Sequence, residues 1–336
     1  MKVEIKNFKS IKKVEIDLAT INVLIGPPNS GKSNFLESLY LYGIKRRLEY
    51  FYEKTGMEYN DLKFIRGFEY PLSFFRDFDF KNIIKINIEN YEELNISLER
   101  DQLIFNDKDI YSLDIQTPLI LLYRYENFLL YGEKDWKFPD YLLPGFENLN
   151  YIIAEKYENV GQNLIKRFND TLSNFYLELR IEKEREGKKF KIKDILSNYV
   201  YDLTTIYDIA QSVQYLILFS SAVLFGEVFS ETGENIIILL EEPDAHMYPI
   251  LIEEFIDLLK DISSAYIILT THNEHTLLTL IDKIPKDKIK VFGVIRGKEG
   301  YTEIYELDIE KLRDFVIKKE AEVIRNLHYF IDKLKT

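Results

Sequence analysis

The stretch that decides the fold is Gly26-Pro27-Pro28-Asn29-Ser30-Gly31-Lys32-Ser33, near the start of a chain of 336 residues. Its two glycines let the backbone curl, so that successive N–H groups point inward and form an anion-binding nest. Lys32 adds a positive charge for the β and γ phosphates, and the Ser33 hydroxyl is a ligand for Mg²⁺. The stretch therefore predicts a phosphate-binding loop that holds ATP with Mg²⁺.

The residues around this loop give it the context that such a loop requires. Residues 21–25 form a continuous apolar run, as expected of a buried strand. Residues 33–48 have helical periodicity. The predicted helix points its positive N-terminal end at the same phosphates. Strand, glycine loop and helix together favour a P-loop protein over a chance match.

Two further buried strands end in polar side chains. Residues 236–240 are all Ile or Leu and are followed by Glu241 and Glu242. Alternation sends the two carboxylates in different directions, so one can face the metal while the other reaches the attacking water. Residues 265–270 form another such strand, which leads to His272. In a parallel sheet the carboxyl ends of strands face the ligand crevice, so His272 is predicted to contact the γ-phosphate or the attacking water.

The rest of the chain divides into segments of different character. Alternating apolar and polar side chains at 3–7 and 13–18 predict an antiparallel strand pair. Short alternating segments between about 50 and 200 predict an inserted β-rich lobe with helical parts. We expect one head over 1–336, with a nucleotide-binding core at 1–48 and 200–310 and a C-terminal helix at 309–336. The other predicted elements are strands 118–123 and 235–240, hairpins 177–195 (with Gly187 in the turn) and 288–307, and helices 147–174, 208–225 and 250–261.

The composition limits the possible functions. There is no cysteine, which excludes disulfides, zinc knuckles and thiol catalysis and fits a cytoplasmic protein. The net charge is −12, so the molecule as a whole offers no basic surface for non-specific nucleic-acid binding. No apolar run reaches the roughly 18–20 residues that span a bilayer, and we expect no membrane contact. The histidines at 272 and 275 with Glu274 fit part of a zinc site, but their spacing fixes no third ligand.

These motifs resemble those of the SMC/RecF-like branch of the ABC-type ATPases, among the small AAA-15/AAA-21-like or overcoming-lysogenization-defect-type ATPases. The segments that carry the resemblance are residues 6–11, 26–34, 241–249 and 270–273. They span both ends of the predicted core. The segment between them matches only by position.

The resemblance implies an α/β fold, namely a P-loop head of ABC type with an antiparallel β lobe and a helical insertion. It also implies roles: residues 26–34, Asn34 included, would bind ATP, and Ser33 and Glu241 would hold Mg²⁺. Glu242 would polarise the attacking water, and His272 would sense the γ-phosphate. Two residues of the first strand turn, Lys9 and Ser10, would lie near the nucleotide base. ATP would be held between two heads, so a homodimer is expected on ATP binding.

The sequence departs from the family pattern in three places. Glu241 stands where an aspartate is usual, and Tyr248 stands where a histidine is usual. Gln211 and Ser212 stand where the family has a Ser-Gly pair that contacts the γ-phosphate of the partner. The Gln211 amide and the Ser212 hydroxyl are the two candidates for this contact, and the alternative is that the segment is only a buried helix. No glutamine marks a Q-loop.

Three functions remain open at this point. The leading one is an Mg²⁺-dependent ATPase whose dimer closes on ATP and opens after hydrolysis, in DNA transactions or defence against foreign DNA with a separate effector. About 65 residues follow the His272 strand, too few for a usual nuclease domain. The altered signature favours instead a nucleotide-gated binding module with little turnover. A small-molecule kinase is disfavoured by the roughly 200 residues between the phosphate loop and Glu241.

Overall fold

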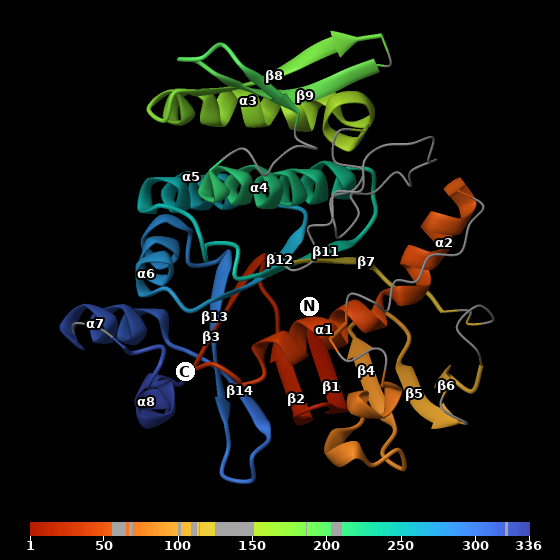
Figure 1. Cartoon of the computed structure of the whole chain (residues 1–336). Helices are drawn as coiled ribbons and strands as arrows, with labels where there is room; N and C mark the ends of the chain where they lie inside the picture. The colour runs from red at the N-terminus through yellow and green to blue at the C-terminus, as the bar shows by residue number, and fades with distance from the viewer. Residues whose placement is uncertain are drawn as a thin grey trace.

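A six-stranded central sheet carries the predicted phosphate-binding strand. The computed structural model describes residues 1–55, 65–66, 70–99, 102–108, 113, 115–124, 151–185, 187–202, 210–319 and 322–336. The strands of the sheet are β3 (Ile21–Ile25), β7 (Leu119–Tyr123), β11 (Ile236–Glu241), β12 (Tyr266–Thr271), β13 (Ile289–Arg296) and β14 (Thr302–Glu306). They lie in the order β14-β13-β3-β12-β11-β7, and all neighbours are parallel except β13 and β14 (Figure 1). The carboxyl ends of the five parallel strands therefore meet at one edge.

Both faces of the central sheet are buried. In β3, Ile21, Val23 and Ile25 belong to the core on one face, whereas Leu24 belongs to the core on the other. Parallel strands that are covered on both faces read as nearly continuous apolar runs. The predicted strands 21–25, 118–123, 235–240 and 265–270 are confirmed, as is the hairpin 288–307.

One face of the central sheet packs against helix α1 (Lys32–Tyr42), and α1 in turn packs against a five-stranded antiparallel sheet. That sheet has the order β2-β1-β4-β5-β6 and consists of β1 (Lys2–Phe8), β2 (Ile11–Asp17), β4 (Ile84–Ile88), β5 (Leu94–Glu99) and β6 (Gln102–Phe105). The predicted strand pair is confirmed as β1 and β2, and β1 also pairs with β4. Residues that precede the phosphate loop thus share a sheet with residues of the predicted insertion. Two short 3₁₀ turns, η2 (Pro71–Phe74) and η3 (Arg76–Phe78), precede β4.

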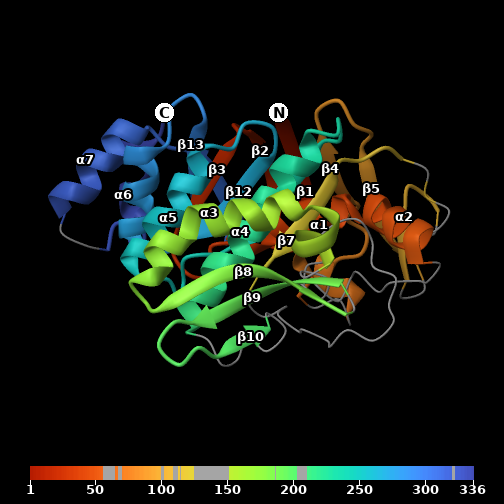
Figure 2. The same cartoon turned by 90° about the horizontal axis from the view of Figure 1, so that it is seen from above.

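The other face is covered by helices α4 (Gln211–Ser230), α5 (Pro249–Lys260) and α6 (Glu274–Lys283). Outside α4 and α5 lies a further layer of α3 (Glu158–Ser173) and a three-stranded sheet (Figures 1 and 2). Its strands are β8 (Leu177–Glu184), β9 (Gly187–Asp194) and β10 (Val200–Asp202), and a π-helical turn, η5 (Tyr151–Lys156), precedes α3. The predicted hairpin 177–195 is confirmed as β8 and β9.

Helix α4 is longer than its apolar run indicated. By length and composition it is the one helix in the described part of the chain that is apolar enough to cross a membrane, but 89% of the 18-residue window that meets this test is buried inside the molecule. It therefore serves as a core helix. It begins at Gln211 rather than at 208, and residues 203–209 lie outside the described residues.

The predicted helix over 33–48 is interrupted. Helix α1 ends at Tyr42, and α2 (Ile44–Thr55) begins after Gly43. A Cβ atom at Gly43 would lie 2.8 Å from the Ile120 Cβ atom, so glycine lets the chain pass close to β7 at this bend.

The prediction of one C-terminal helix over 309–336 is wrong. The segment forms α7 (Ile309–Lys319) and α8 (Leu327–Leu334), and Glu322 between them has a φ of 71°. Val323 and Ile324 are buried in the core, and α8 packs back against β13. Burying these side chains requires a turn that a straight helix does not provide.

The strand at 118–123 was expected in the inserted lobe, but β7 is an edge strand of the central sheet. A pairing with β11 explains this position, because Leu119 to Tyr123 align with Ile236 to Leu240. The boundaries of core and inserted lobe otherwise stay a prediction. Part of the helix predicted over 147–174 lies outside the described residues, and the rest forms η5 and α3.

Candidate functional site

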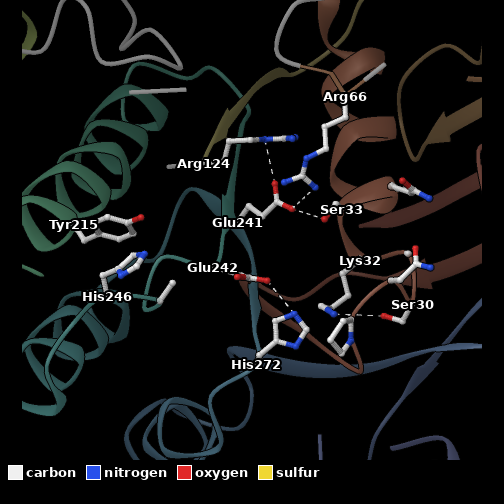
Figure 3. Close-up of a pocket in the computed structure, with 15 residues that line it drawn as sticks. Ser30, Lys32, Ser33, Arg66, Arg124, Tyr215, Glu241, Glu242, His246 and His272 are labelled. Atoms are coloured by element: carbon white, nitrogen blue, oxygen red, sulfur yellow. Dashed lines mark hydrogen bonds and ion pairs between the residues drawn. The ribbon is translucent and has the colours of Figure 1, made fainter. Parts of the chain in front are cut away.

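A pocket of about 600 Å³ lies at the carboxyl edge of the central sheet (Figure 3). This volume is in the range of small-molecule sites. Most of the predicted site residues line this pocket. Five further residues that were not predicted from the sequence also line it, namely Arg66, Arg124, Tyr215, Ala245 and His246. The predicted residues that line it are Pro28, Asn29, Ser30, Gly31, Lys32, Ser33, Asn34, Glu241, Glu242 and His272.

The phosphate loop lies on the β13–β14 hairpin. Gly26 has a φ of 154°, and a Cβ atom there would lie 2.0 Å from the backbone oxygen of Val294. The Thr302 hydroxyl donates to the Ser30 carbonyl at 2.9 Å, and Arg296 Nε donates to the Asn29 carbonyl at 2.9 Å. These contacts fix the curve of the loop from behind and leave its inner side to the pocket.

Replacing Gly26 with alanine is expected to destabilise the protein more than replacing Gly233, by about 1–3 kcal/mol. Both glycines have positive φ values, 154° and 92°, but nothing lies within 4 Å of a Cβ atom at Gly233. The difference between the two variants therefore isolates the clash with the Val294 carbonyl. Urea unfolding of both variants measures it, and equal losses of stability would contradict the close contact.

The N-terminus of α1 is free to bind an anion. Gly31 occupies the N-cap position without a side-chain cap, and the first turn contains no acidic residue. The backbone N–H groups of a first helical turn have no partner within the helix, and the helix dipole favours negative charge there. A phosphate group suits this helix end.

Lys32 lies inside the curve of the loop. Its side chain is buried, and Nζ donates to the carbonyls of Gly26 and Pro27 at 2.9 and 3.0 Å. Burial lowers the pKa of Lys32 to about 8, although the carboxylates of Glu242 and Glu241 oppose this shift. The cation is thus held in the pocket without a salt bridge to a carboxylate among the residues that the structure describes.

ATP affinity is expected to fall by about tenfold per pH unit above pH 8, if only the charged form of Lys32 binds phosphate. ATP phosphates stabilise the ammonium group, so binding between about pH 8 and pH 9 takes up a proton. Isothermal titration calorimetry in two buffers with different ionisation enthalpies measures both effects. An affinity that stays constant over this range would contradict the titration of Lys32.

Ser33 and Glu241 meet at the predicted metal position. The Ser33 hydroxyl donates to Glu241 Oε1, and Glu241 is 8% exposed. Two arginines also contact this carboxylate: Arg66 Nη1 lies 3.1 Å from Oε1, and Arg124 Nε lies 3.1 Å from Oε2. Hydroxyl and carboxylate oxygens are the hard ligands that Mg²⁺ prefers, so this pair fits the ion. Among the described residues, no group of three or more His, Asp or Glu side chains that could hold a metal is found, here included, so a metal at this position would also need phosphate oxygens.

Glu242 points the other way, toward His272 (Figure 3). Its φ of 49° lies in the left-handed region, which residues with side chains seldom adopt and which is typical of functional sites. His272 Nε2 lies 2.9 Å from Glu242 Oε1, and this hydrogen bond holds the pKa of Glu242 below its usual value. Nearby, the Thr271 hydroxyl donates to buried Asp244 at 2.7 Å, which ties the loop after β11 to β12.

The structure does not bring Lys9 and Ser10 into the lining of the pocket. Lys9 Nζ donates to buried Glu37 of α1 at 2.6 Å. The Ser10 hydroxyl contacts Thr302 Oγ1 at 2.6 Å and accepts from Asn34 at 2.7 Å. Both residues therefore support the P-loop helix from behind. Their predicted contact with the base stays a prediction.

Gln211 and Ser212 form the N-terminal end of α4 and do not line the pocket of their own chain. Tyr215, one turn further, does line it and meets His246 edge-on, with ring centroids 5.0 Å apart. The predicted contact of Gln211 or Ser212 with the nucleotide of a partner stays a prediction.

Of the five pocket residues that the sequence did not predict, Arg124 could have been found by looking for polar side chains just after buried strands. Arg124 directly follows the predicted strand 118–123, as Glu241 and His272 follow theirs. Arg66, by contrast, follows no strand or helix that the sequence predicts, and Tyr215 lies within an evenly apolar helix. No local pattern marks either residue.

The profile of the family described as "AAA domain, putative AbiEii toxin, Type IV TA system" matches residues 21–278. Among solved structures, an Smc head bound to the C-winged helix domain of ScpA has a TM-score of 0.55 and 15% identity, over 93% of this chain and 98% of that chain. An Smc head with an extended coiled coil, bound to the C-terminal domain of ScpA derived from Pyrococcus furiosus, has a TM-score of 0.55 and 14% identity, over 95% and 99%. No curated protein gives a significant match.

The similarity to the Smc heads concerns the fold alone. It confirms the predicted α/β P-loop head of ABC type with an antiparallel β lobe. The match to the AAA-domain family, taken together with this fold, supports the resemblance to SMC/RecF-like ATPases at the level of the superfamily. The overcoming-lysogenization-defect-type branch stays a prediction.

Proposed function

The chain belongs to this family of AAA domains, and on that premise we propose that it is an Mg²⁺-dependent ATPase in which two heads close on ATP. The observation that carries the proposal is the convergence of three pairs of groups in one pocket. The first pair is the uncapped N-terminus of α1 and Lys32. The second pair is Ser33 and Glu241, which are hydrogen-bonded, and the third is Glu242 and His272, and all three line the same pocket.

Each group has a role in this proposal. Lys32 and the N–H groups of α1 bind the β and γ phosphates. Mg²⁺ held by Ser33 and Glu241 supplies positive charge to the same phosphates. Glu242 orients the attacking water and accepts hydrogen bonds from it, because a carboxylate with a lowered pKa stays ionised at neutral pH. His272 holds that carboxylate in place.

The position of Gln211 supports dimerisation. It begins α4 outside the pocket of its own chain and is partly exposed, whereas Ser212 beside it is buried, so Gln211 is the better candidate for contact with a second head. Smc heads with this fold bind ScpA domains in the solved structures, and the family description names type IV toxin–antitoxin systems. We therefore propose a cytoplasmic nucleotide switch that acts with a separate effector or on DNA, in DNA transactions or in defence against foreign DNA.

Light scattering of the Glu242→Gln variant is expected to show a doubling of mass when ATP and Mg²⁺ are added, and no change with ADP. The variant binds ATP without consuming it, so the closed state accumulates. A matched control, Glu253→Gln, alters an exposed carboxylate on α5. A strict monomer at saturating ATP would contradict the two-headed arrangement.

Phosphate release separates the enzyme from its main alternative. The wild type is expected to release phosphate from ATP well above the rate of Glu242→Gln. Equal, near-zero rates in both, with ATP still bound, would favour a nucleotide-gated binding module. The altered signature at Gln211 and Ser212 is the feature that would favour that outcome.

A further inference from the structure

Arg124 has no role in the function proposed above, yet it lies in the pocket. It directly follows β7, whose Tyr123 aligns with Leu240 in the parallel pairing with β11. Arg124 therefore stands beside Glu241 at the carboxyl edge of the sheet. It lines the pocket and is only 3% exposed.

Two carboxylates fix the orientation of the guanidinium group. Arg124 Nη1 donates to Glu37 Oε1 at 2.9 Å, and Nε lies 3.1 Å from Glu241 Oε2. Glu37 is 1% exposed and also binds Lys9, so two cations hold its carboxylate in place. Figure 3 shows the guanidinium group extending from the end of β7 over Glu241.

Two nitrogens of this group lack a hydrogen bond. Arg124 Nε and Nη2 are both buried without a hydrogen-bond partner among the residues that the structure describes, and Nε lies 3.1 Å from Glu241 Oε2 in an ion pair. A buried charged donor without an acceptor is unfavourable, and an anionic oxygen in the pocket would satisfy it. The planar fork of arginine presents such a donor at a fixed angle, which suits phosphate.

We propose that Arg124 Nη2 binds an oxygen of the γ-phosphate, so that the pocket distinguishes a nucleoside triphosphate from a diphosphate. The strand order supports the γ position: β12 and β11 separate β7 from β3 and its phosphate loop. Arg124 thus lies across the pocket from Lys32, on the side toward which the outermost phosphate of a nucleotide held by the loop would project. The inference rests on the proposed nucleotide binding and adds the residue that selects ATP.

The dissociation constants of ATP and ADP with Mg²⁺, in a chain that carries Glu242→Gln, test this assignment. Adding Arg124→Gln is expected to raise the dissociation constant of ATP by about 10–100-fold and that of ADP by less than about threefold. Arg124→Lys keeps the charge but loses the fork, so it is expected to restore only part of the difference. The control is Arg47→Gln, which removes another buried guanidinium near β7, one that donates to the Ile120 carbonyl outside the pocket. It is expected to leave the ratio of the two constants unchanged.

Arg124→Gln leaves Glu37 without one of its partners, and the variant can fail to fold. The double variant Glu37→Gln/Arg124→Gln removes both charges and is expected to give the same loss of ATP selectivity. Equal changes for ATP and ADP, or no change, would show that Arg124 is only a counter-ion and would overturn the inference while leaving nucleotide binding intact. If the Glu242→Gln chain binds neither nucleotide, the proposed function fails together with it.

Discussion

Replacing Glu242 with glutamine is expected to lower the rate of ATP turnover by about 10²–10⁴-fold. Glutamine has the same shape but cannot accept a proton from water. ATP affinity is expected to stay within about threefold, because Lys32 and the α1 end still bind the phosphates. Steady-state phosphate release and equilibrium ATP binding measure the two quantities separately.

The matched control for this variant is Glu253→Gln, whose carboxylate pairs with Lys283 on the surface. It is expected to retain the wild-type rate. A Glu242→Gln variant that turns ATP over at the normal rate would remove this carboxylate from the mechanism. His272→Ala adds a second check: without its hydrogen bond the pKa of Glu242 rises toward the usual value, so the loss of activity in acid begins at a higher pH.

Replacing Lys32 with alanine is expected to weaken ATP binding by at least about 100-fold and thereby abolish turnover at ordinary ATP concentrations. The protein should nevertheless stay folded. Burial lowers the pKa of Lys32, so folding disfavours its charged form at neutral pH, and this penalty offsets the hydrogen bonds that Nζ donates to the Gly26 and Pro27 carbonyls. Loss of binding without loss of stability is typical of a residue kept for its ligand.

Binding of a fluorescent ATP analogue and thermal unfolding measure both effects. Lys283→Ala, which removes a lysine paired with Asp257 and Glu253 on the surface, is the control. It is expected to bind ATP as the wild type does. A Lys32→Ala protein that binds ATP normally would refute the phosphate-loop assignment, whatever its stability.

Much of the site could be predicted because its residues follow buried strands. β3, β11 and β12 are short apolar runs, and the polar residue that ends each run is visible in the sequence. The same holds for the glycine loop, whose backbone conformation requires those residue types. Their roles in binding and hydrolysis stay predictions until the variants are measured.

The rest depended on contacts between distant parts of the chain. β7 joins the central sheet by pairing with β11, more than 100 residues later, and no local pattern encodes that pairing. Arg124 could therefore not be placed beside Glu241. The ion pair of Lys9 with buried Glu37 on α1 joins residues 28 positions apart, and no local pattern predicts it. The break between α7 and α8 likewise reflects the burial of Val323 and Ile324 in a core that forms only in the complete fold.

The contacts behind the phosphate loop also bear on how the protein is made. Val294, Arg296 and Thr302, which hold the loop in its curve, are synthesised more than 260 residues after residues 26–31. At about 5–20 residues per second, that interval lasts on the order of 13–50 s. During this time the nascent chain carries the loop sequence without its support. The shaped nucleotide pocket therefore arises only after the β13–β14 hairpin has been translated, so an interrupted chain carries the loop without a pocket that holds ATP.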